Sequence, residues 1–67
     1  MNLPEELRAE IARVTEIIKE LEDLKINPEE LVLRMMKQHI KTAQQAIDFD
    51  DSETMYKYLK VLNEYKL

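Results

Sequence analysis

The most extended pattern in this sequence is the helical spacing of apolar residues between positions 28 and 49. Wound as an α-helix of about 100° per residue, the segment gathers these residues in one arc of about 200°. An ordinary surface helix needs an apolar stripe of only about 100°. We therefore predict that residues 28–49 form the central helix of a small bundle, packed on both sides. The arc consists of Leu31, Val32, Leu33, Met35, Met36, His39, Ile40, Ala43, Ala46, Ile47 and Phe49.

Two further segments have helical periodicity, at residues 4–24 and 52–66. The first carries three heptads with charged flanks, which is typical of a short coiled-coil strand but also of a helix within its own bundle. We favour the bundle, because three heptads are the minimum for a coiled coil. The third segment has an apolar arc of about 160°. The apolar residues are Leu7, Ile11, Val14, Ile18 and Leu21 in the first segment, and Met55, Tyr58, Leu59, Val61, Leu62 and Tyr65 in the third.

The two connections between these segments are short and contain residues that favour helix starts. Asn27 is a suitable N-cap, Pro28 suits the first helical position, and Glu30 completes a capping box. Asp50 or Asp51 is expected to cap the third helix. Connections this short make consecutive helices antiparallel. We therefore predict an all-α fold over residues 1–67: a three-helix bundle, up-down-up, with two long helices and a shorter third.

Composition limits how much stability this single domain can reach. The chain has 67 residues and neither glycine nor cysteine, which excludes disulfides and disfavours tight β-hairpins. A core of this size rarely contributes more than about 3–5 kcal/mol. Because the 200° arc is wide and the chain is short, we predict a homodimer that covers part of it.

The charge and the hydropathy of the sequence exclude several classes of function. A net charge of −4 argues against direct binding of nucleic acid, which requires a basic surface. No uncharged run is long enough to span a membrane, and the acidic N-terminus lacks the pattern of a signal peptide. The absence of cysteine fits a reducing compartment. We expect a cytoplasmic protein of bacterial or phage type.

The acidic residues around position 50 resemble the first ligands of a calcium loop. Asp48, Asp50 and Ser52 have the required alternation. Such a loop also needs glycine at its sixth position and a bidentate glutamate at its twelfth, where this chain has Glu53 and Leu59. Capping of the following helix explains the acids better, and we predict no metal site.

His39 is the only histidine in the sequence. Without cysteine it could bind zinc only together with carboxylates or a second subunit. We interpret it as a neutral, hydrogen-bonded side chain in or beside the core, with a pH-sensitive role as the alternative. Nucleophilic catalysis requires a nucleophile, a base and an orienting group, and the sequence offers no such set. We predict neither a catalytic site nor a cofactor.

Six residues are candidates for an interaction surface. Methionine side chains adapt to varied partners, although at helical spacing they more often fill a core. The tyrosine candidate projects away from the apolar arc of its helix, where an exposed aromatic can anchor a partner. The three basic candidates could contact phosphates weakly, but we expect them to face the first helix, since residues 1–24 hold seven acids and three bases. The six are Met35, Met36, Tyr56, Arg34, Lys37 and Lys41.

These observations favour a small acidic helical module, structural or regulatory, that acts by binding another protein and by self-association. The alternative is an accessory or inhibitor protein of phage or defence systems, which would bind a nucleic-acid enzyme through its acidic face. The two differ in salt dependence, because contacts made by charged groups weaken as salt is added and apolar contacts do not. No motif in the sequence is specific enough to identify a family.

Overall fold

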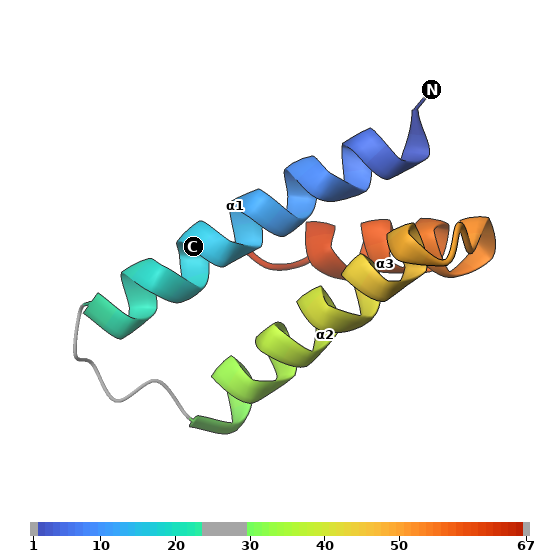
Figure 1. Cartoon of the computed structure of the whole chain (residues 1–67). Helices are drawn as coiled ribbons and strands as arrows, with labels where there is room; N and C mark the ends of the chain where they lie inside the picture. The colour runs from blue at the N-terminus through green and yellow to red at the C-terminus, as the bar shows by residue number, and fades with distance from the viewer. Residues whose placement is uncertain (1, 24–29, 67) are drawn as a thin grey trace.

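The computed structural model describes residues 2–23 and 30–66, with side chains of the second segment from residue 32 onward. Three α-helices account for most of these residues: α1 (Leu3–Asp23), α2 (Glu30–Asp48) and α3 (Ser52–Asn63). Each helix packs against the other two, and consecutive helices run in opposite directions (Figure 1). The predicted three-helix bundle is confirmed. The predicted capping box of α2, formed by Asn27, Pro28 and Glu30, lies outside the described side chains.

The nine buried apolar side chains come from all three helices and form one core, against which the partly buried apolar residues pack. This arrangement follows from the amphipathic periodicity of each helix, because an apolar stripe is stable only when another element covers it. The fully or nearly fully buried residues are Leu7, Val14, Ile17, Ile18, Met36, Ala43, Ala46, Met55 and Leu62.

Polar side chains define the starts of α1 and α3. The Asn2 side-chain oxygen accepts a hydrogen bond from the backbone N–H of Glu5 at 3.2 Å. Asp51 caps α3, since its carboxylate accepts hydrogen bonds from the backbone N–H of Thr54 at 3.2 Å and from its hydroxyl at 2.6 Å. These bonds hold the pKa of Asp51 below its ordinary value, because they stabilise the ionised carboxylate.

The turn between α2 and α3 is made without glycine. Asp50 has φ 54°, the left-handed conformation that ends many helices. Its backbone N–H donates to the carbonyl of Ile47 at 3.1 Å, and that of Asp51 donates to Ala46 at 2.9 Å. This hydrogen-bond pair is a Schellman motif. Aspartate occupies the position that glycine usually holds, because its short polar side chain tolerates this region better than most residues.

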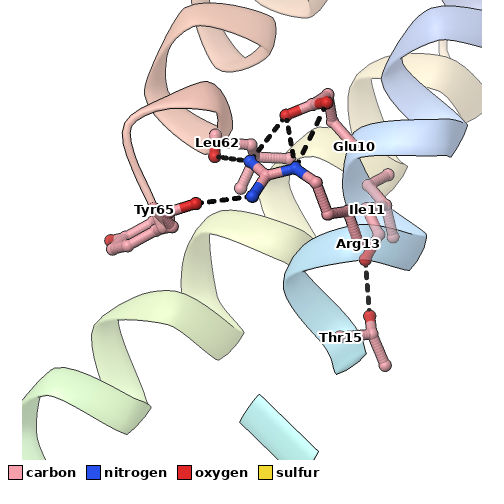
Figure 2. Close-up of polar contacts among 6 residues, drawn as sticks. All are labelled: Glu10, Ile11, Arg13, Thr15, Leu62 and Tyr65. Atoms are coloured by element: carbon pink, nitrogen blue, oxygen red, sulfur yellow. Dashed lines mark hydrogen bonds and ion pairs between the residues drawn. The ribbon is translucent and has the colours of Figure 1, made fainter. Parts of the chain in front are cut away.

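The predicted end of the third helix is wrong: α3 ends at Asn63 and not at residue 66. Beyond it, the backbone N–H groups of Glu64 and Tyr65 donate to carbonyls three residues earlier, a tighter turn than an α-helix. The turn brings the carbonyls of Leu62 and Tyr65 to the guanidinium of Arg13 on α1, at 2.7 and 2.6 Å (Figure 2). Arg13 therefore caps α3 from another helix.

Glu10 fixes the position of the Arg13 side chain. One carboxylate oxygen of Glu10 lies 2.8 Å from Nη2 of Arg13, one helical turn further along α1 (Figure 2). This hydrogen bond raises the pKa of the Arg13 guanidinium above its ordinary value, so Arg13 carries its positive charge throughout the physiological range. A cation at the C-terminal end of α3 also interacts favourably with the helix dipole.

Candidate interaction surface

The two methionine candidates of α2 point in different directions. Met36 is 2 % exposed and belongs to the core, so its selection as an interface residue is corrected in favour of core filling. Met35 is 48 % exposed. The difference arises because successive positions on a helix are rotated by about 100°. Of the pair, Met35 is available to a partner.

The three basic candidates are all exposed on α2. Lys37 is placed where we expected, with its Nζ 3.7 Å from a carboxylate oxygen of Glu22 on α1. Both side chains are about half exposed, so this ion pair contributes little to stability. Arg34 and Lys41 are also exposed, and each is followed by a residue without charge, Met35 and Thr42.

Tyr56 lies on the surface of α3, where the helical periodicity places it. It is 51 % exposed, and the ammonium group of Lys60 lies 4.9 Å from the centre of its ring. Lys60 lines a shallow groove between α1 and α3, together with Glu6, Glu10 and other residues. Tyr56 is thus associated with the charged α1–α3 side, and the structure does not join it with Met35 in one surface.

His39 of α2 is partly buried against α3 and the residues that follow it. Its Nδ1 lies 2.7 Å from the hydroxyl of Tyr65, and its ring packs edge-on against Tyr58, with 5.8 Å between the ring centres. Burial raises the pKa of the Tyr65 phenol above its ordinary value, so its hydroxyl stays protonated; which of the two groups donates depends on the imidazole tautomer. His39 is hydrogen-bonded beside the core, and this contact holds the residues that follow α3 against α2.

Exposed apolar side chains concentrate on α2. Among the described residues, the large apolar side chains that are most exposed are Val32 (40 %), Met35 (48 %), Phe49 (80 %) and Tyr56 (51 %). Helix α2 has 19 residues and α3 has 12, or about 28 and 18 Å of helix. Because α3 is shorter, it leaves the first turns of α2 uncovered, which exposes Val32 and Met35.

The exposure of Phe49 corrects the predicted apolar arc at the C-terminal end of α2. We placed this residue with the core-facing positions, but it follows the last residue of α2 and is 80 % exposed. Its backbone N–H still donates to the carbonyl of Gln45 at 2.9 Å, so it keeps the helical register of α2. Its ring lines a shallow groove on the outer side of the α2–α3 turn; the other lining residues are Thr42, Gln45, Ala46, Asp51 and Thr54.

Met35 and Phe49 are the ends of a continuous row of side chains without charge. The row advances by three and four residues, so its members lie one above another on α2. All are exposed except Thr42, which is partly exposed. The chain has 36 % charged residues, and none of them belongs to this row. We call it the uncharged stripe of α2: Met35, Gln38, Thr42, Gln45 and Phe49.

No protein-family model, no curated protein and no solved structure matches this chain. Within residues 2–23 and 30–66, no three histidine or acidic side chains gather closely enough to hold a metal ion. In the same part of the chain, no helix is long and apolar enough to cross a membrane. The functional argument therefore depends on the surface of the molecule itself.

Sequence reasoning identified one end of this surface and missed the rest. It selected Met35, assigned Phe49 to the core, and grouped Gln38 and Gln45 with the polar side of the helix. The signal that could have revealed the stripe is the lack of charge at five consecutive positions of one helical row, since a solvated helix face in a charge-rich chain normally includes lysine or glutamate.

Proposed function

We propose that this chain is a protein-interaction module and that the uncharged stripe of α2 is its binding surface. The observation that supports this proposal is the exposure of Phe49 at one end of the stripe and Met35 at the other, with no charged residue between them in the row. Covering a phenylalanine side chain contributes about 1.5–3 kcal/mol. A partner that covers both ends would therefore gain most of its affinity from these two residues.

The shape of the stripe favours a helical partner. A straight row of side chains at spacings of three and four is the surface against which a second helix packs, with side chains of one helix entering the spaces between those of the other. The amide and hydroxyl groups of Gln38, Thr42 and Gln45 remain solvated at the edges of such a contact or hydrogen-bond across it. This mode of binding requires no bound cofactor and no ionisable group at the centre of the contact.

The experiment that tests this function is site-specific photo-crosslinking in native cell extract. A benzophenone side chain replaces Phe49 in one variant and Tyr56 in a matched control, since both positions are exposed aromatics. We expect a discrete crosslinked protein from position 49 alone, and we expect a second substitution, Met35→Lys, to abolish it. If neither position yields a discrete product, the proposal is wrong.

Salt dependence separates this function from the alternative, in which the acidic face binds a basic enzyme cleft. The crosslink from position 49 should persist when the ionic strength rises from about 0.1 M to about 1 M, where charged contacts are largely screened. A product that forms only at low salt, or from position 56 beside the charged α1–α3 groove, would favour the acidic-face function instead.

A further inference from the structure

We infer that the partner of the uncharged stripe is a second copy of this chain, with the two α2 helices packed antiparallel across a two-fold axis. The inference rests on the proposed function only in using the stripe as the binding surface. It adds the identity of the occupant and the geometry of the contact.

The order of residues in the stripe supports a symmetric contact. A two-fold interface uses the same patch on both subunits, so the patch must complement itself when reversed. The stripe has a large apolar residue at each end, Met35 and Phe49, and uncharged polar residues between them. Read from Met35 to Phe49 or from Phe49 to Met35, the order is the same: one apolar residue, three polar residues and one apolar residue. An antiparallel contact therefore brings the Met35 end of one stripe beside the Phe49 end of the other.

The groove beside Phe49 provides a position for a side chain of the second copy. Four of its lining residues, Thr42, Gln45, Ala46 and Phe49, are spaced as the four residues that form a hole for a knob in helix–helix packing. Antiparallel packing that brings Met35 of the partner subunit into this hole also brings Gln38 opposite the partner's Thr42. By symmetry, Met35 of the first copy enters the partner's hole, so both apolar ends of both stripes are covered at once.

The charges beside the stripe favour the antiparallel direction. Arg34, Lys37, Lys41 and Asp48 each precede a residue of the stripe by one position and form one of its margins. Lys37 is paired with Glu22 on α1. Antiparallel packing brings Arg34 near Asp48 of the partner subunit and Asp48 near the partner's Arg34, which gives two attractive pairs. Parallel packing would align each of these four charges with its own copy, so every pair would be repulsive. Lys41 lies near the two-fold axis in the antiparallel arrangement, where it leaves one like-charge pair.

Measurement of mass in solution tests the occupant. At about 100 μM protein, well above a micromolar dissociation constant, light scattering should give twice the monomer mass of 8.0 kDa. Phe49→Lys should raise the dissociation constant about 30-fold or more, as expected for an interface anchor. Tyr56→Lys, an equal change at another exposed aromatic, should leave the mass unchanged. Circular dichroism melts establish that both variants remain folded.

Disulfide trapping tests the direction of the helices, and the absence of native cysteine makes it unambiguous. Met35→Cys mixed with Gln45→Cys should form a disulfide between the two variants under mild oxidation, because the antiparallel arrangement brings these positions within the roughly 7 Å that a disulfide requires between Cα atoms. A disulfide of Met35→Cys with itself would show a parallel contact and would overturn the geometry. Tyr56→Cys serves as the control for random collision.

Different results would contradict the dimer, the stripe as its contact surface, and the proposed function. A wild-type protein that is monomeric at this concentration, with a crosslink from position 49 to a different protein, overturns the second copy as occupant and leaves the proposed function standing. A dimer that Tyr56→Lys dissociates and Phe49→Lys does not would overturn the stripe as the contact. A monomer without any crosslink from position 49 overturns both.

Discussion

Replacement of Arg13 by methionine should destabilise this domain more than the same replacement of Arg8, the other arginine of α1. Methionine keeps the apolar stem of the side chain and removes the guanidinium, so the change isolates the hydrogen bonds. Those bonds join α1 to the carbonyls of Leu62 and Tyr65, at 2.7 and 2.6 Å. They cap α3 and, together with the contact between His39 and Tyr65, hold the residues after it.

The magnitude follows from the geometry of these contacts. A hydrogen bond to a charged group contributes about 1.5–3 kcal/mol when well buried. The Arg13 side chain is 37 % exposed, and water can replace the guanidinium at both carbonyls after the substitution, so the lower part of this range or less applies to each bond. We expect a total loss of about 2 kcal/mol. In a domain of this size that loss lowers the melting temperature by about 8–16 °C.

Thermal and urea unfolding followed by circular dichroism measure the effect, with Arg8→Met as the matched control. Arg8 is an exposed arginine of the same helix, so its replacement changes net charge and helix propensity equally. Hydrogen exchange should also show that amide protection falls first at the end of α3. The reasoning is refuted if the two variants melt within about 2 °C of each other, since the carbonyl contacts would then contribute nothing measurable.

Three further predictions concern the α2–α3 turn, the N-cap of α3, and the buried and exposed sides of α3. Asp50→Gly should stabilise the domain by about 0.5–1 kcal/mol in urea unfolding, because glycine adopts the left-handed φ of 54° without strain. Asp51→Ala should lower the melting temperature at neutral pH, and the difference from wild type should disappear in acid: the contribution of this carboxylate is complete above its ordinary pKa of 3.8 and is lost as the pH falls through its lower folded pKa. Leu62→Ala, at a fully buried position, should cost about 2–5 kcal/mol, whereas Tyr56→Ala should cost no more than about 0.5 kcal/mol in the same melts.

The helices could be predicted from the sequence because their signals are local. Amphipathic periodicity located all three, and the acids before α3 limited its N-cap to Asp50 or Asp51, of which Asp51 is the cap. The end of α3 could not be predicted, because the sequence around Tyr65 continues the helical pattern. The carbonyls of the turn there are hydrogen-bonded by Arg13, which is 49 residues from Leu62 and 52 from Tyr65. No local pattern contains that information.

The candidate surface was predicted in part for a related reason. Periodicity gives the direction in which a side chain points, but it does not say whether another helix lies there. Phe49 and Val32 share the apolar side of α2 with buried residues. Helix α3 begins after Phe49 and ends before it reaches Val32, so it covers neither side chain. Exposure therefore depends on the relative lengths and offsets of the helices, which follow from the packing of the complete chain.

The contact between Arg13 and the end of α3 has a consequence for the rate at which this domain opens. Its two hydrogen bonds join residues separated by 49 and 52 positions, so their formation requires a large loop to close and is expected late, after the folding transition state. Interactions absent from that transition state leave the folding rate nearly unchanged and slow unfolding. Arg13 would then slow the unfolding of this bundle without changing its folding rate, so the domain stays closed for longer than its free energy of unfolding alone suggests.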